Sequence, residues 1–238
     1  MRKPAIPLDE RIIFALDLPT AALAKEWVLR LESRVKFFKV GLQLFLAEDS
    51  QGLIDWIRQR GCKVMLDLKF FDVPETVKLA VAQVANLGAT FITVHGNEPI
   101  IRAAVESRGE SRILAVTVLT SFGLADMEAM GMTASIEDFV YWRAKRAIDA
   151  GCDGVVSSGL EAARLRKEMG DHFYVVTPGI RPGANVLDDS DDQKRIVTAR
   201  QAILNGADHV VVGRPIRNAA DPLAVVAALQ EEIRSVSP

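Results

Sequence analysis

The sequence lacks a strong charge of either sign, and this absence limits the partners that we expect it to bind. Its 238 residues include 29 Lys and Arg against 31 Asp and Glu, which gives a formal net charge of −2. Nucleic-acid-binding proteins normally carry a basic excess or patch, and anionic membrane surfaces also attract basic segments. We therefore expect neither a nucleic acid nor a membrane as a partner. Apolar residues at 49% and charged residues at 25% are typical of a soluble globular protein.

Cysteine is also scarce. Cys62 and Cys152 are too few for a disulfide framework or a zinc finger, and each precedes an apolar run, so we expect two small buried side chains. The N-terminal segment has two basic residues but lacks the apolar stretch of a secretory signal. No apolar run reaches the roughly 18 residues that a membrane span needs. These absences predict a cytoplasmic protein.

Several motifs of well-known enzyme classes are missing. The first apolar run is not followed by G-x-G-x-x-G, and the chain contains no G-x-x-x-x-G-K-[ST], H-E-x-x-H or G-x-S-x-G. The three histidines, His95, His172 and His209, form no pair with the spacing of metal ligands. We therefore expect no metal site.

The sequence does contain a series of short apolar runs that are rich in β-branched residues. Such runs are typical of strands buried on both faces, as in a parallel sheet. They occupy residues 12–18, 37–41, 63–69, 91–95, 112–119, 154–158, 173–180 and 209–216. Amphipathic helical patterns lie between them, at residues 19–33, 74–88, 136–151, 198–207 and 221–235. This alternation indicates repeated β-α units.

Two α/β architectures can be built from such units. A doubly wound sheet usually binds a nucleotide through an early glycine fingerprint, which is missing here. Eight units in 238 residues instead favour a closed (β/α)8 barrel, the TIM barrel. We expect residues 1–238 to form a single domain of this kind, with its chemistry at the C-terminal ends of the strands.

Charged residues gather at the predicted ends of the first three strands. Asp17 lies at the end of the first, Lys39 at the end of the second, and Asp67 and Lys69 at the end of the third, with Asp72 three residues further on. In a barrel, these ends converge on one mouth. Charges of both signs are therefore expected to meet there.

The alternation of side chains along a strand predicts the direction of these charges. Asp67 and Lys69 are two residues apart and should face the same way, into the barrel mouth. The intervening Leu66 and Leu68 suit the side that faces the helices. Lys39 on the neighbouring strand should point into the same mouth.

Two interpretations without a catalytic role are open at this stage. Asp72 could cap the helix that begins near Pro74. Asp17, Lys39, Asp67 and Lys69 could form a buried ion-pair network with no function. Since buried ion pairs rarely add net stability over apolar packing, their presence at this end of a barrel favours a site.

The loops after the last two predicted strands combine glycine with arginine. The seventh contains Arg181 within residues 178–183, and the eighth contains Gly213 and Arg214. Glycine lets backbone N–H groups approach an anion closely, and arginine adds a bidentate contact. These two loops are the frequent phosphate site of such barrels, although ordinary Gly/Pro turns are the alternative.

The seventh loop is also long. It ends with Asp191, Asp192 and Gln193 before the next helix, and its length suits a lid. His95 follows the fourth strand, so it is expected near the site, whereas His172 and His209 lie at strand starts, the opposite end of the barrel.

Residues 67–76, Asp-Leu-Lys-Phe-Phe-Asp-Val-Pro-Glu-Thr, resemble the D-x-K-x-x-D-I-P-N-T signature of the orotidine 5′-phosphate decarboxylase family, bacterial type. Similar segments cover nearly the whole chain: ALDL with Asp17, FFKVG with Lys39, TVHG with His95, VTVLTS with Thr120 and Ser121, PGIRPG with Arg181, then Gln193, and VGRPI with Arg214. Two positions depart from the family pattern, because Phe71 stands where His is common and Glu75 where Asn is common. Neither replaces a residue given chemistry in the family.

The resemblance implies a decarboxylase that needs no cofactor or metal and converts orotidine 5′-monophosphate to UMP and CO2 in pyrimidine biosynthesis. Its catalytic residues would be Lys69, Asp67, Lys39 and Asp72. Lys69 would stabilise the carbanion left at C6 of the pyrimidine and then protonate it. A homodimer is implied as well, in which Asp72, Val73 and Thr76 reach the partner's site.

The same resemblance implies the substrate-binding residues. Asp17 and Lys39 would bind the ribose, Thr120 and Ser121 the pyrimidine edge, and four residues the phosphate. The implied substrate-binding set is Asp17, Lys39, Val73, Thr76, Thr120, Ser121, Pro178, Arg181, Gln193, Gly213 and Arg214, of which Arg181, Gln193, Gly213 and Arg214 would hold the phosphate.

Two other functions stay open. One is a metal-dependent sugar-phosphate decarboxylase or aldolase, since such relatives share the D-x-K-x-x-D core, although they have a metal-binding Glu where this chain has Lys39. The other is a catalytically silent barrel that only binds a phosphorylated ligand. Loss of orotidine 5′-monophosphate absorbance, measured with and without EDTA, separates the three.

Overall fold

The computed structural model describes residues 4–182 and 195–236. Within them, parallel strands pair in chain order and close into an eight-stranded barrel. The strands are β1 (Ile12–Ala15), β2 (Phe37–Gly41), β3 (Lys63–Phe70), β4 (Phe91–Val94), β5 (Arg112–Val116), β6 (Gly154–Val156), β7 (Tyr174–Thr177) and β8 (His209–Val212). Because β8 pairs with β1, the sheet has no open edge, so the predicted (β/α)8 barrel is confirmed and the doubly wound sheet is excluded.

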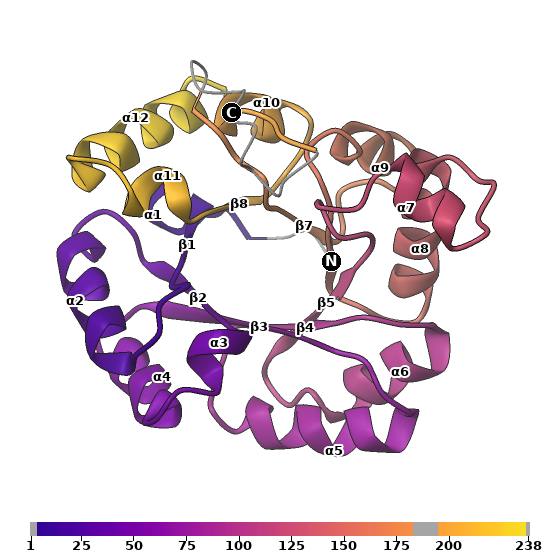
Figure 1. Ribbon diagram of the computed structural model, residues 1–238, viewed down its shortest axis with the longest axis horizontal. Helices are drawn as coiled ribbons and strands as arrows, with labels where there is room; N and C mark the ends of the chain where they lie inside the picture. Colours follow the sequence, from indigo (N-terminus) through magenta and orange to yellow (C-terminus); the bar gives the residue numbers. More distant parts are fainter. Residues whose placement is uncertain (1–3, 183–194, 237–238) are drawn as a thin grey trace.

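Helices form a ring outside this barrel (Figure 1). Those in the described residues are α1 (Leu8–Arg11), α2 (Ala21–Leu31), α3 (Leu42–Phe45), α4 (Ser50–Gln59), α5 (Pro74–Ala85), α6 (Glu98–Ser107), α7 (Leu124–Ala129), α8 (Ile136–Asp149), α9 (Ala162–Met169), α10 (Ala199–Leu204), α11 (Arg214–Arg217) and α12 (Pro222–Arg234). The five predicted helical segments correspond to α2, α5, α8, α10 and α12. Side-chain caps mark several helix starts; Thr20 Oγ1, for instance, accepts a hydrogen bond from Leu23 N at 3.3 Å.

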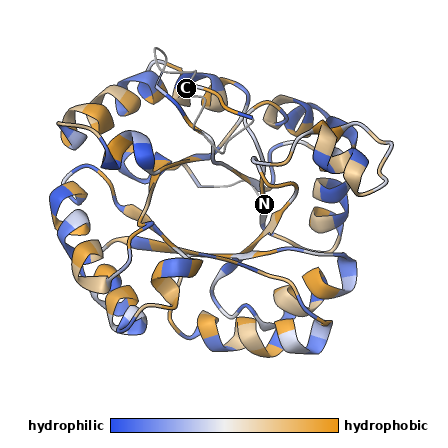
Figure 2. Cartoon of the chain, in the orientation of Figure 1, coloured by the Kyte–Doolittle hydropathy of each residue, from blue (hydrophilic) through white to orange (hydrophobic). Residues whose placement is uncertain are grey.

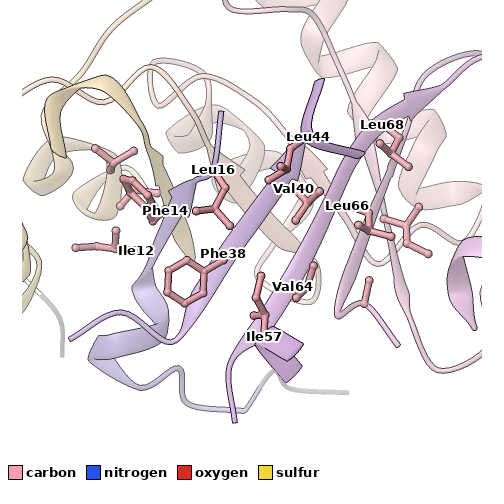
Figure 3. Close-up of a cluster of buried hydrophobic side chains, with 14 of the residues drawn as sticks. Ile12, Phe14, Leu16, Phe38, Val40, Leu44, Ile57, Val64, Leu66 and Leu68 are labelled. Atoms are coloured by element: carbon pink, nitrogen blue, oxygen red, sulfur yellow. The ribbon is translucent and has the colours of Figure 1, made fainter. Parts of the chain in front are cut away.

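The core has two layers, one on each side of the strands. Outward-facing residues such as Phe14, Phe38 and Leu66 pack between strands and helices (Figure 3). Each helix of the outer ring carries both hydrophilic and hydrophobic residues, as amphipathic cover of a sheet requires (Figure 2). The first apolar run continues to Leu18, but β1 ends at Ala15. Leu16 and Leu18 still pack in the outer layer of the core, beyond the end of the strand.

Inward-facing aromatic residues fill the N-terminal end of the barrel. The rings of Phe37 and Phe91 stack with centroids 5.3 Å apart, and the ring of His209 lies 5.5 Å from each. His209 is the first residue of β8 and is buried. It therefore lies at the N-terminal ends of the strands, as predicted. His172 precedes β7 at the same end and is exposed. Packed rings therefore close the interior of the barrel at this end.

Candidate active site

A cavity of about 250 Å³ opens at the C-terminal ends of the strands. It collects most of the residues that the sequence singled out. The predicted residues that line it are Asp17, Lys39, Asp67, Lys69, Thr120, Ser121, Pro178, Arg181, Gly213 and Arg214. Its walls also include residues that the sequence did not single out, among them Met65, Val156 and Ser157.

Alternating charges form a continuous chain along one wall of this cavity. Lys39 Nζ donates to Asp17 Oδ1 at 2.8 Å and lies 3.6 Å from Asp67 Oδ2. Lys69 Nζ donates to the other oxygen of Asp67, Oδ1, at 2.8 Å. The predicted convergence of these four side chains is therefore confirmed. Asp17 lies two residues beyond the end of β1, whereas Lys39 lies within β2.

Burial and mutual attraction compete at the centre of this array. Burial favours the neutral form of Lys39, but Asp67 and Asp17 hold the pKa of this lysine above its usual value. Burial would likewise raise the pKa of Asp67, but Lys39 and Lys69, with hydrogen bonds from Lys69 and Thr93, hold the pKa of Asp67 below its usual value. Both groups therefore stay charged at neutral pH in a largely buried position.

The backbone at Lys69 departs from the regular strand that the sequence predicted. Lys69 has a φ of 50°, in the left-handed region that a residue with a Cβ seldom adopts. The pairing of β3 with β4 is irregular between Leu66 and Phe70. Leu66 and Leu68 nevertheless pack in the outer core, as predicted. Alternation along the strand therefore predicted the right side-chain directions but not the backbone conformation of Lys69.

Two arginines stand with glycines at the expected phosphate end of the cavity. Arg214 begins α11, directly after its N-cap Gly213. A Cβ on Gly213 would lie 3.3 Å from Ala15 Cβ and 3.6 Å from Asp17 Oδ2, so a side chain here would crowd the first strand end. Arg181 lies after β7 and donates from Nη1 to Ile180 O at 2.8 Å. The predicted residue Gln193 and the neighbouring Asp191 and Asp192 lie outside the described residues.

A buried ion pair that the sequence did not predict supports the loop that follows β5. Arg195 Nη1 donates to Glu161 Oε1 at 2.6 Å, and both residues are buried. Arg195 Nη2 also donates to the carbonyl oxygens of Val118 and Leu119, at 3.0 Å each. These carbonyls directly precede Thr120, so the arginine fixes the start of that segment. No sequence pattern links partners so far apart in the chain.

Asp72 and its neighbours lie outside the cavity of their own chain. Asp72, Val73 and Thr76 are exposed and do not line the cavity. Asp72 Oδ1 accepts a hydrogen bond from Val73 N at 2.6 Å, but the N-cap of α5 is Val73, without a side-chain cap bond. The interpretation of Asp72 as a helix cap is therefore wrong, because its carboxylate accepts from the N–H of Val73, the N-cap residue itself.

His95 lies beside the charged cavity rather than in it. It lines a neighbouring, mostly apolar pocket of about 440 Å³ with Phe71 and Arg143. Its Nδ1 lies 3.4 Å from Arg143 Nη2, and its ring centroid lies 5.5 Å from that of Phe71. Burial, then Arg143 and Lys69, lower the pKa of His95 to about 4. The imidazole is therefore neutral at physiological pH.

Comparison with known proteins places the chain in a family. The model of the orotidine 5′-phosphate decarboxylase / HUMPS family matches residues 10–229. The chain belongs to this family. Orotidine 5′-phosphate decarboxylase from Methylococcus capsulatus is 51% identical over 231 residues, covering 97% of this chain and 95% of that protein. The corresponding protein from Xanthomonas euvesicatoria is 45% identical, covering 100% and 98%.

Two solved structures share the fold of this chain, and one of them is an orotidine 5′-phosphate decarboxylase. The crystal structure of orotidine 5′-phosphate decarboxylase from Lactobacillus acidophilus aligns with a TM-score of 0.81 at 34% identity, covering 94% of this chain and 99% of that one. An uncharacterized conserved protein from Geobacillus kaustophilus aligns with a TM-score of 0.78 at 31% identity, covering 93% and 99%.

The two departures from the family pattern lie outside the cavity. Phe71 is 69% exposed, and Glu75 is an exposed residue in the first turn of α5. Among residues 4–182 and 195–236, no group of three or more His, Cys, Asp or Glu is placed to hold a metal ion. Within the same part of the chain, no helix is long and apolar enough to cross a membrane.

Proposed function

We propose that this chain converts orotidine 5′-monophosphate to UMP and CO2 in pyrimidine biosynthesis. Membership of the orotidine 5′-phosphate decarboxylase / HUMPS family supports this function, as do the names of the similar proteins from Methylococcus and Xanthomonas. The observation that carries the proposal is the array of Asp17, Lys39, Asp67 and Lys69 in one cavity with two arginines.

The cavity offers a different group to each part of this substrate. Arg181 and Arg214, with Gly213, would bind the phosphate, since guanidinium groups match phosphate oxygens bidentately. Asp17 and Lys39 would bind the ribose hydroxyls. Thr120 and Ser121 would meet the pyrimidine edge, which leaves the reacting carbon toward Lys69. Remote phosphate binding then supplies free energy that can lower the barrier.

Lys69 would perform the chemical step. The bond between C6 and the carboxylate breaks, CO2 leaves, and the electron pair stays on C6. The ammonium group of Lys69 stabilises this developing carbanion and then gives it a proton, and solvent restores the proton on Lys69. Asp67, which accepts from Lys69 Nζ at 2.8 Å, would keep this ammonium group oriented before the substrate arrives.

We propose that the reaction needs no metal. A divalent cation prefers several oxygen ligands, but the carboxylates in the cavity already hold Lys39 and Lys69. The two ammonium groups would repel a cation near the reacting carbon. This chemistry disfavours the metal-dependent sugar-phosphate alternative.

The proposal includes a homodimer in which Asp72, Val73 and Thr76 complete the partner's site. Exposed apolar side chains on the same loop and helix support it: Phe71 is 69% exposed, Val73 62% and Leu79 59%. Such a patch is typical of an interaction surface, and a two-fold axis would exchange the loops reciprocally.

We also propose that residues 1–238 form one domain and that the protein acts in the cytoplasm. The free thiols of Cys62 and Cys152 support the cytoplasmic location.

One assay tests the proposed function. The purified chain is mixed with orotidine 5′-monophosphate, and the loss of substrate absorbance is followed with and without EDTA. We expect turnover that exhaustive chelation leaves unchanged. Activity that disappears with EDTA and returns with Mg²⁺ would contradict metal independence. Binding without turnover would instead support a silent phosphate-binding barrel.

A further inference from the structure

The ladder between β3 and β4 is interrupted beside the charged array. Leu66 pairs with Ile92, and the next pairing is Phe70 with Val94. Three residues of β3, Asp67 to Lys69, therefore face a single residue of β4, Thr93. The backbone of this stretch cannot be held by a regular ladder, although it carries two members of the array.

The hydroxyl of Thr93 takes the place of the missing ladder bonds. Thr93 is fully buried, and its Oγ1 accepts a hydrogen bond from Lys69 N at 2.9 Å. The same oxygen lies 3.1 Å from Asp67 Oδ1 and 3.5 Å from Leu66 O. A hydroxyl has one proton to donate, and a carboxylate is the stronger acceptor, so the proton belongs on the bond to Asp67.

These two bonds act on the two groups that the chemistry needs. Lys69 has a φ of 50°, a conformation that is unfavourable for a residue with a Cβ and persists only where the surroundings hold it. The bond from Lys69 N to Thr93 supplies such a hold from the neighbouring strand. The bond to Asp67 Oδ1 fixes the oxygen that also accepts from Lys69 Nζ.

We propose that Thr93 is a positioning residue, whose hydroxyl fixes the backbone of Lys69 and the carboxylate of Asp67 so that the lysine ammonium meets the reacting carbon. This inference rests on the proposed function. Thr93 does not line the cavity, so it acts through Lys69 and Asp67 and not on the substrate. Without the hydroxyl, Lys69 relaxes toward the extended conformation and its ammonium group moves.

The test compares Thr93→Val, which keeps the shape and removes the hydroxyl, with Thr93→Ser, which keeps the hydroxyl. Displacement of a reacting group by about 1 Å can cost about 100-fold in rate, so we expect kcat of Thr93→Val to fall about 10- to 100-fold. KM should change little, because the phosphate and ribose contacts remain. Thr93→Ser should recover most of the activity.

The pH profile separates positioning from mere stability. Removing a hydrogen bond to the charged form of Asp67 raises the pKa of that carboxyl, so the acid limb of kcat should move to higher pH in Thr93→Val and stay in place in Thr93→Ser. Thr177→Val is the matched control. Thr177 is also buried, at the end of β7, and its hydroxyl has no hydrogen-bond partner among the described residues.

Folded Thr93→Val with the kcat and pH profile of the parent would overturn the inference, and so would equal loss in the Val and Ser variants. If Thr93→Val does not fold, Thr93→Cys replaces it, since a thiol of similar size is a weak donor and acceptor. A Cys variant as active as the Ser variant would then overturn it. Lys69→Ala distinguishes the two levels, because its retained activity would sink the proposed mechanism itself.

Discussion

The ammonium nitrogen of Lys69 lies 2.8 Å from Oδ1 of Asp67. The two residues are two positions apart on β3, in the stretch where the pairing of β3 with β4 is irregular. This pair joins the buried centre of the array to one of its two exposed ends, since the side chain of Asp67 is 13% exposed and that of Lys69 is 37% exposed. A cation held in this way is oriented before any substrate binds. In the proposed mechanism, reorganisation of this cation would therefore add little to the barrier.

Replacing Lys69 with alanine should abolish turnover and leave the fold intact. The change removes the cation that would stabilise the carbanion and the acid that would protonate it. Loss of a single stabilising donor costs roughly 3 kcal/mol, or about 100-fold in kcat, so the loss of both roles should exceed this. Absorbance assays give kcat, and UMP titration checks that phosphate-ligand binding survives.

Lys167→Ala is the control for this change, because Lys167 is exposed on α9 in the outer ring. It should have the activity of the parent. Near-normal kcat in Lys69→Ala would contradict the proposed mechanism, whatever the control does.

Replacing Arg214 with alanine should mainly weaken the binding of phosphorylated ligands. Hydrogen bonds to charged groups contribute about 1.5–3 kcal/mol each, so kcat/KM for orotidine 5′-monophosphate should fall at least 10- to 100-fold. Any residual activity on the nucleoside without phosphate should stay unchanged. Arg200→Ala, on exposed α10 surface, is the matched control. Equal losses on both substrates would show that Arg214 does not serve the phosphate.

Much of this site can be predicted from the sequence, because the C-terminal ends of the strands in a closed barrel meet at one mouth, whatever the conformation of the loops. The strand positions and the two-residue alternation of side chains were enough to place Asp17, Lys39 and Asp67 in the cavity. The left-handed backbone of Lys69 was not predictable, since it depends on a local mismatch between two strands. Thr93 left one signal, a polar residue within the apolar run 91–95.

Other features depend on contacts between distant segments. Arg195 meets Glu161 and the carbonyls of Val118 and Leu119 only after the barrel has closed. Periodicity describes single elements and carries no information on such meetings. The packing of His95 against Phe71 and Arg143, beside the site, was missed for the same reason.

A mixture of two inactive variants should regain activity if Asp72 serves the partner's site. Lys69→Ala and Asp72→Ala chains are each expected to be nearly inactive alone. After re-equilibration at equal concentrations, half of the dimers are hybrids, and each hybrid has one site with both residues intact. The recovered activity should approach about a quarter of that of the parent, under random pairing in a two-fold dimer.

Subunit exchange is checked with a tagged chain, so that a negative result can be interpreted. Exchange without recovered activity would mean that Asp72 does not act in the partner's site. The exposed position of Asp72, outside its own chain's cavity, is the reason to expect recovery.

His209 should make the protein less stable as the pH falls from about 6.5 to about 4. Burial lowers the pKa of this histidine to about 4, and its Nδ1 lies 2.8 Å from Glu10 O, to which it donates as the neutral ring. Between these two pH values the unfolded chain binds a proton that the folded barrel does not, so the unfolded state is favoured. The difference between the two pKa values corresponds to a decrease in the free energy of unfolding on the order of 3 kcal/mol.

Denaturant unfolding across this pH range measures the effect, with a glutamine variant of the same residue as the comparison. Glutamine can still donate to Glu10 O but does not titrate, so His209→Gln should lose part of the pH dependence that the parent shows. His172→Gln should keep the full dependence, because His172 is exposed. If all three proteins lose stability equally between pH 6.5 and 4, carboxyl groups cause the loss and the buried imidazole does not.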